Sequence, residues 1–426
     1  MWLHAERKFV HLKTQRFIQR ALALIDKMNR ITLIFYILIF SLNSYCQQDS
    51  FYNHIELGEY SVGYCDTIIF DDSLNYSQFN YEGPAPIFVQ IWHPFVSTEH
   101  RNCISYGDFR SPKVSPELEK IYTELSIRLD SAFIRYNISV EYKTWKEIDY
   151  KKYSHEEILD KLKSQKTKTS FKHLKQDSNF PVIVYHHGNQ GPSDENYLMA
   201  EYFASRGYIF ISANFELPFA NHTFGYREGD LKEPNTSTPR KVIEFAKSTS
   251  SSEQLFYVGH SYGAQVGFCI LHEEGLADAF VSMETTMEFK WPIKPLEHVK
   301  NTWPVLYNTI VEHQKDYQLP MLMMANTREN PPFVFFNELF PEIHHRYTLQ
   351  VSSKSNFGHE SYTSIYFLRY LNRKFYKQPD SNRLKGQFKM YIQNLKLIES
   401  FLNNQLTNQE LNINEFKKNY FIEEKK

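Results

Sequence analysis

From Pro181 onward, apolar runs of strand length alternate with amphipathic runs of helix length. The first run, PVIVYHH, is apolar almost throughout, as a strand buried on both faces of a sheet requires. Further runs of this kind follow at 208–215, 254–259, 279–284, 320–326 and 347–352, and helical patterns separate several of them. Such β-then-α alternation predicts the α/β fold class, with a mostly parallel sheet and helices on both faces.

The chain on either side of this region is organised differently. Residues 58–70 and 85–93 alternate as half-buried strands do, which predicts the opening meander of a mixed sheet. Residues 116–175 are helical and charged, and we interpret them as an inserted cap or lid, although a helical layer packed on the sheet fits the same pattern. The main domain is therefore expected at 47–380, with a C-terminal helical extension at 381–426.

Composition excludes some classes of protein. The 48 basic residues are balanced by 49 acidic ones, and no basic run is interleaved with aromatic residues, so a nucleic-acid partner is not expected. The four cysteines (Cys46, Cys65, Cys103 and Cys269) have no metal-ligand spacing, so no metal is expected. Cys65 and Cys103 could form a disulfide in an oxidising compartment or stay unpaired, and Cys269 is expected in the core.

The amino terminus has the pattern of a secretory signal peptide. Residues 31–42 are apolar and follow a basic flank, but a membrane-spanning helix needs about 20 such residues. Ser44 and Cys46 place small residues at the third and first positions before a cut that would precede Gln47. An uncleaved membrane anchor is the alternative interpretation.

The leader and signal peptide together are expected at 1–46. Because Met28 begins a signal of ordinary length, the true start is either Met1 or Met28. Residues 1–46 hold seven Lys or Arg and two Asp or Glu, so their removal leaves 41 basic and 47 acidic residues. The mature protein is thus expected to be mildly acidic and exported, either to a periplasm or to the medium.

The pentapeptide Gly259-His260-Ser261-Tyr262-Gly263 is the strongest chemical motif. It follows a predicted strand and opens a predicted helix, which is the setting of a nucleophile elbow. A serine there lies on a strained turn, and the residues two places on either side must be small. The amino terminus of the helix also places positive partial charge beside a developing oxyanion. The motif therefore predicts that Ser261 is a nucleophile.

A nucleophilic serine needs two donors for the oxyanion and a general base. We expect the backbone N–H groups of Tyr262 and Asn189 to be the donors, the latter from the Gly-rich loop 186–191. Among 17 histidines, His359 is the expected base, because it follows the strand 347–352 and catalytic groups gather at the carboxyl ends of parallel strands. His344 and His345 precede that strand.

The HG loop, the GHSYG elbow and the late Gly358-His359 pair resemble the α/β-hydrolase superfamily. Within it, the chain is most similar to plasma-type platelet-activating-factor acetylhydrolases and dienelactone-hydrolase-like esterases. The segment ELGEYSVGYCDTIIF…APIFVQIWHPF resembles the opening meander of that group. The resemblance covers roughly 56–110 and 180–375, and it implies the α/β-hydrolase fold for the main domain.

The resemblance also implies a function. It points to a serine carboxylic-ester hydrolase that acts through an acyl-enzyme and needs no cofactor or metal. Its substrates would be small-molecule esters of short-acyl or phospholipid type, with transient contact to a membrane surface. The alternatives are a thioesterase or peptidase on the same fold, or a non-catalytic binding protein built on it.

The carboxylate that orients His359 is harder to assign. The acetylhydrolases have Asp just after the strand that follows the elbow helix, whereas this sequence has Glu284 there. The next strand ends in Asn326, with Glu329 three residues later. We expect Glu284 to be the acid; because Glu is one methylene longer than Asp, the His359 loop should then lie slightly farther away.

Overall fold

A computed structural model describes residues 54–96, 102–139, 154–175, 178–189, 191–220, 232–285, 295–325, 333–344, 347–355, 357–368, 381–407 and 411–425. The chain divides into two units, Met1–His54 and Ile55–Lys426, and the second contains the sheet and its helices. The predicted signal peptide lies outside the described residues. Within those residues, no helix combines the length and the apolar character needed to cross a membrane.

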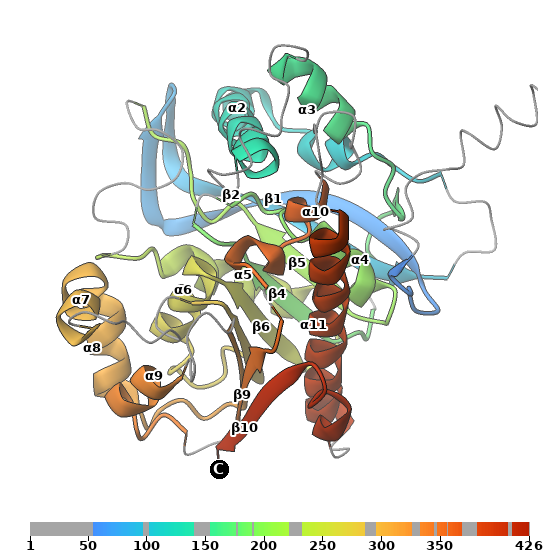
Figure 1. The fold of residues 1–426 in the computed structure, drawn as a ribbon. Helices are drawn as coiled ribbons and strands as arrows, with labels where there is room; N and C mark the ends of the chain where they lie inside the picture. Colours follow the sequence, from blue (N-terminus) through green and yellow to red (C-terminus); the bar gives the residue numbers. More distant parts are fainter. Residues whose placement is uncertain are drawn as a thin grey trace, which may run out of the picture. The chain divides into compact units, whose positions relative to one another are not determined.

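The described strands form one 10-stranded sheet in the order β10-β9-β8-β7-β6-β4-β5-β2-β1-β3 (Figure 1). Strands β4 to β9 pair in parallel, whereas the β1–β2, β2–β5 and β9–β10 pairs are antiparallel. The predicted α/β-hydrolase fold with its mostly parallel sheet is therefore confirmed. The strands are β1 (Ser61–Gln78), β2 (Tyr81–Phe95), β3 (Thr169–Phe171), β4 (Val182–His186), β5 (Ile209–Ala213), β6 (Leu255–His260), β7 (Ala279–Met283), β8 (Met321–Ala325), β9 (Thr348–Ser353) and β10 (Tyr420–Lys425).

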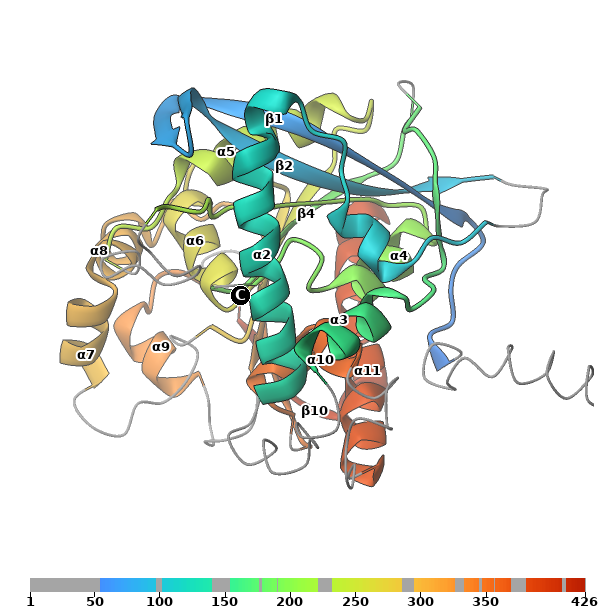
Figure 2. The same cartoon turned by 90° about the horizontal axis from the view of Figure 1, so that it is seen from above.

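Helices cover both faces of the sheet (Figures 1 and 2). Helices α4 and α11 pack together on one face, and α5, α6 and α8 cover the other. The helices are α2 (Pro116–Ser139), α3 (His155–Lys163), α4 (Tyr197–Ala204), α5 (Ser237–Ser248), α6 (Tyr262–Ile270), α7 (Pro295–Thr302), α8 (Pro304–His313), α9 (Val334–Leu339), α10 (Ile365–Leu368) and α11 (Ser381–Thr407). Because both faces are covered, every residue of β4, β5, β7 and β8 is buried, and their sequences show little polar alternation.

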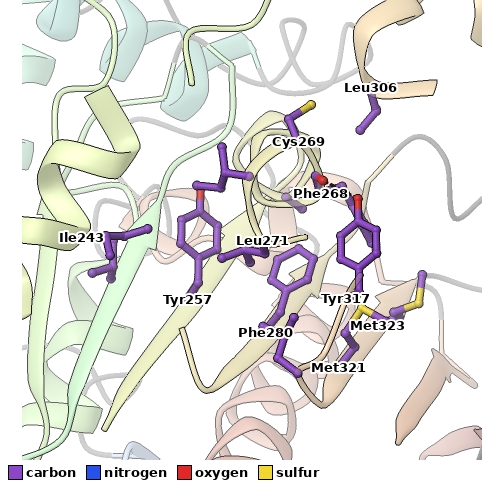
Figure 3. Packing of buried hydrophobic residues seen from close by; sticks show 14 of the residues in the cluster. Ile243, Tyr257, Phe268, Cys269, Leu271, Phe280, Leu306, Tyr317, Met321 and Met323 are labelled. Atoms are coloured by element: carbon purple, nitrogen blue, oxygen red, sulfur yellow. Dashed lines mark hydrogen bonds between the residues drawn. The ribbon is translucent and has the colours of Figure 1, made fainter. Parts of the chain in front are cut away.

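The main core lies between the sheet and the helices α5, α6 and α8 (Figure 3). Phe280, Met321 and Met323 from the strands meet Phe268 of α6 there. Each such side chain contributes about 1.5–3 kcal/mol on burial. Cys269 is buried as predicted, and burial raises the pKa of its thiol to about 12.

Cys65 has a free thiol. The disulfide to Cys103 that the sequence leaves open is therefore not formed in this structure.

Two described parts of the segment 116–175, α2 and β3, contact the sheet directly. Helix α2 buries its apolar face against Tyr76 and Phe88 of the β1–β2 hairpin, using Leu118, Ile121, Leu125 and Leu129. Strand β3, which was not predicted from the sequence, pairs in parallel with β1. The buried carboxylate of Glu201 in α4 accepts hydrogen bonds from the Lys168 N–H (2.6 Å) and the Thr169 hydroxyl (2.7 Å), and burial raises its pKa to about 7. This segment thus forms one edge of the sheet.

A buried ion pair joins the turn that precedes this segment to the loop after β4. Arg110, in the 3₁₀ turn Tyr106–Arg110, binds Asp194 through Nε (2.7 Å) and Nη2 (2.9 Å), and both side chains are 2% exposed. The Tyr106 hydroxyl donates to the same carboxylate (2.9 Å), and Asp130 of α2 holds Arg110 from the other side (3.3 Å). The loop after β4 is therefore held by the turn at 106–110, which α2 in turn contacts through Asp130.

The C-terminal extension contains more than a helix. Helix α11 matches the predicted amphipathic pattern at 383–406, but residues 420–425 add the edge strand β10, antiparallel to β9. Its sequence, YFIEEK, is half charged, as expected of an exposed edge that must avoid pairing with other chains. The same charges make the strand hard to recognise from sequence.

We predict that Arg110→Met lowers the free energy of unfolding by about 3 kcal/mol or more, since it leaves the Asp194 carboxylate buried without its cation. The matched control is Arg240→Met. Arg240 pairs with Glu273 at the surface, where the two side chains are 32% and 42% exposed, and its loss should cost at most about 1 kcal/mol. Urea denaturation measures both. Equal, small effects would show that the buried pair does not hold the loop.

Candidate active site

Ser261 lies on a tight turn between β6 and α6. Its φ is +52° and its ψ is −111°, a conformation that L-residues rarely adopt. A Cβ at Gly259 would lie 2.5 Å from the Ala264 nitrogen, and one at Gly263 would lie 2.2 Å from the carbonyl oxygen of His186. Both positions therefore require glycine, and the backbone has the geometry that the motif predicts.

His359 lies beside Ser261. It begins the 3₁₀ turn His359–Tyr362, after β9, and its Nε2 is 2.9 Å from the Ser261 Oγ. This is a hydrogen-bond distance, and it is within the range over which a general base takes a hydroxyl proton. The side chain is 29% exposed, so the imidazole is reached from solvent while its far side faces protein.

Glu284 lies on the other side of His359. It directly follows β7 with a left-handed φ of +56°, and its N–H donates to the Met324 carbonyl of β8 (2.8 Å). Its side chain is fully buried, and Oε1 is 3.8 Å from His359 Nδ1. That separation is within ion-pair range but longer than an N–H···O hydrogen bond. The alternative acid, Glu329, falls outside the described residues.

The loop after β4 reaches Ser261. A Cβ at Gly188 would lie 3.5 Å from the Ser261 Cβ, so this backbone passes next to the turn. Asn189 follows Gly188 and is half-buried, and Tyr262 follows Ser261 at the start of α6 and is buried. Gly188 and Ser261 thus meet at the site. Asn189 and Tyr262, the predicted oxyanion donors, directly follow these two residues in the chain.

Glu195 and His260 form a buried pair behind the site, and neither was assigned a role from the sequence. The Glu195 Oε1 accepts hydrogen bonds from the Tyr185 hydroxyl (2.7 Å) and the Gly188 N–H (3.0 Å), and lies 3.3 Å from His260 Nδ1. Burial by itself would raise the pKa of Glu195, but His260, His187 and the Tyr185 hydroxyl together hold that pKa below its ordinary value. Glu195 is therefore a buried carboxylate rather than a carboxylic acid.

Asn196 was missed as well. Its amide nitrogen donates to the Tyr185 hydroxyl (3.2 Å) and the Tyr362 carbonyl (3.0 Å), and its Oδ1 accepts from the Ser364 N–H (3.1 Å) and the Tyr391 hydroxyl (2.7 Å). The residue thus joins the loop after β4 to the segment after His359. Asp or Asn residues before an apolar helix are typical helix caps, so the sequence gives no sign that the Asn196 side chain is buried and joins two loops.

The site is formed by side chains and backbone. Among the residues that the structure describes, no group of three or more His, Cys, Asp or Glu side chains is arranged to hold a metal ion.

No model of a known protein family matches the sequence, and no curated protein matches it. Among solved structures, the chain is similar to a ferulic acid esterase from Streptomyces cinnamoneus, with 11% identity and a TM-score of 0.49 over 80% of this chain and 91% of that one. It is also similar to an esterase from Thermogutta terrifontis (17% identity, TM-score 0.37, 54% of this chain and 85% of that one). A third similar structure is an acylaminoacyl peptidase from Pyrococcus horikoshii (15% identity, TM-score 0.36, 55% of this chain and 39% of that one). Identities this low say nothing about substrate.

We predict that Gly263→Ala lowers the free energy of unfolding by about 1–3 kcal/mol or more, because the new methyl group collides with the His186 carbonyl and neither backbone can move aside. The control is Gly386→Ala in α11, where a Cβ meets nothing within 4 Å. That change should raise stability by up to about 1 kcal/mol, the gain in helix propensity. Thermal or urea unfolding of both variants checks the pair, and a neutral Gly263→Ala would contradict the packing argument.

Proposed function

We propose that the protein is a serine carboxylic-ester hydrolase. The observation that carries the proposal is the 2.9 Å contact between His359 Nε2 and Ser261 Oγ, at a serine held with positive φ on a strand-to-helix turn. A serine hydroxyl is a weak nucleophile until a neighbouring base takes its proton, and this contact provides one. A non-catalytic binding protein has no need of such an arrangement.

The proposed reaction has two steps. Ser261 Oγ attacks the ester carbonyl carbon as its proton passes to His359 Nε2; the tetrahedral intermediate then collapses, and the alcohol leaves with that proton. Water then attacks the acyl-enzyme with His359 again acting as base, which releases the carboxylic acid and restores Ser261. The backbone N–H groups of Tyr262 and Asn189 would stabilise the oxyanion in both steps.

Glu284 would orient His359 and stabilise the imidazolium. Its fully buried carboxylate lies 3.8 Å from Nδ1, on the side of the ring opposite Ser261. Catalytic hydrogen bonds are often long before substrate binds, so a small movement of His359 towards Glu284 would complete this one. The extra methylene of Glu relative to Asp is consistent with a base loop that stands slightly away from the acid.

The substrate class follows from the resemblance to platelet-activating-factor acetylhydrolases. It favours short-acyl or phospholipid-type esters, reached by transient contact with a membrane surface. Thioesterase and peptidase reactions would use the same three residues, so a panel of matched ester, thioester and amide substrates separates these activities.

We also propose that the protein is exported, on the basis of the signal-peptide pattern at 31–46. The expected result of expression in a secreting host is a mature chain that begins at Gln47. Intact-mass measurement of the purified protein checks this. A chain that retains residues 31–46 in the membrane fraction would instead support an anchor.

For the reaction, we predict that Ser261→Ala abolishes both turnover and labelling by a fluorophosphonate. Glu284→Gln should lower kcat by at least ~10²-fold with the fold intact, since it removes the charge that stabilises the His359 imidazolium. Steady-state kinetics on a short-acyl ester measure the second effect.

Glu329→Gln is the matched control, and it should stay within a few-fold of wild type. The opposite ranking of the two Gln variants would assign the acid to the later strand. Equal labelling of Ser261→Ala and wild type would refute the nucleophile.

A further inference from the structure

The histidine inside the elbow motif, His260, contacts both catalytic loops. Its side chain is 5% exposed, and its ring lies beside that of His359 with centroids 5.0 Å apart. Its Nδ1 faces the Glu195 carboxylate at 3.3 Å, and its Nε2 faces the backbone carbonyl oxygen of His359 at 3.2 Å. His260 therefore bridges a buried carboxylate and the backbone of the proposed general base.

The two partners of His260 determine which of its ring nitrogens must carry a proton to make both hydrogen bonds. A carboxylate and a backbone carbonyl can only accept hydrogen bonds, so the ring makes both contacts only when each nitrogen bears a proton. A neutral ring would keep one contact and lose the other.

Glu195 anchors more than His260. Its Oε1 also accepts from the Gly188 N–H, which lies in the proposed oxyanion loop. Its backbone carbonyl accepts from the Ile365 N–H (2.9 Å) and the Ser364 hydroxyl (3.0 Å), in the segment that follows His359. Glu195 thus bonds both to the proposed oxyanion loop and to the segment that follows His359.

We propose that Glu195 and His260 form a second histidine–carboxylate pair, behind the catalytic residues, which positions the backbone of His359 and the oxyanion loop. The inference rests on the proposed function, because it assigns these residues a role in that reaction. Neither is a catalytic residue, since each acts through a neighbour.

Three variants test the pair, since each removes a different link. Glu195→Gln is isosteric and removes the charge. His260→Asn keeps an amide N–H at the place of Nδ1 and so retains only the link to Glu195. His260→Gln keeps one at the place of Nε2 and so retains only the link to the His359 carbonyl. Each is compared with wild type for kcat and KM on a short-acyl ester, for the rate of fluorophosphonate labelling, and for affinity for a boronic acid.

Glu195→Gln should lower kcat by about 10-fold or more with KM within 2-fold, because positioning matters most in the transition state. Its boronic acid affinity should fall by a similar factor. Of the two His260 variants, His260→Gln should be labelled faster by fluorophosphonate, because labelling depends on the position of His359. His260→Asn should bind the boronic acid more tightly, because that binding depends on the oxyanion loop. A merely structural loss would lower all readouts together.

His344→Gln is the matched control. His344 is a buried histidine bonded to Asn337 (2.8 Å) and placed before β9, at the end opposite His359, so its loss should leave kcat within 2-fold. All rates are expressed per fluorophosphonate-titrated site, so that partly unfolded protein does not count. If Glu195→Gln does not fold, Tyr185→Phe, which removes one donor to that carboxylate, should show the same lowered kcat at unchanged KM.

Two results separate failure of this inference from failure of the proposed function. If Glu195→Gln and both His260 variants keep wild-type kcat and labelling while Ser261→Ala is inactive, the positioning pair is refuted and the esterase proposal stands. If all three lose every readout in equal proportion, the role is structural and the inference is again refuted. If Ser261→Ala keeps its activity, the proposed function itself fails.

Discussion

The contact on which the rest of the site depends is the close approach of α6 to the end of β4. Gly263 brings the first turn of the helix against the His186 carbonyl, and no side chain fits between them. This approach forces Ser261 into its left-handed conformation and brings the Gly188 backbone next to it. Ser261 and the Gly188 backbone are thus positioned by one backbone contact, and the strain is offset by the buried strands on either side.

Buried polar and charged side chains hold the loop after β4 in place. Asp194, Glu195 and Asn196 are consecutive and buried, and each binds a different part of the molecule. Asp194 binds Arg110 beneath the 116–175 segment, Glu195 contacts His260, and Asn196 bonds to the segment after His359. Because buried polar groups must be satisfied, these three residues make the loop after β4 rigid and couple it to three elements that are distant in sequence.

The fold could be predicted well where burial leaves a periodic signal. The strands β4 to β9 and the helices α4, α5, α6 and α11 all correspond to apolar or amphipathic runs. The strands β3 and β10 could not be predicted, since β3 has three residues and β10 is half charged at an exposed edge. Their pairing is decided by the neighbouring strands β1 and β9, which local sequence does not contain.

For the candidate site, the sequence by itself determined that Ser261 lies on a strand-to-helix elbow, because the elbow needs two glycines at fixed spacing and that requirement is local. It also indicated His359, because the edge at which a residue follows a parallel strand can be read from its order in the chain. Glu284 and Glu329 both follow such strands, and the prediction of Glu284 came from the resemblance to the acetylhydrolases. Only the tertiary structure decided the 2.9 Å and 3.8 Å separations, and only it revealed Glu195 and His260 as partners. The physical reason is that a hydrogen bond between residues 65 positions apart depends on how the sheet brings the strand ends together, and no periodicity in the chain records that distance.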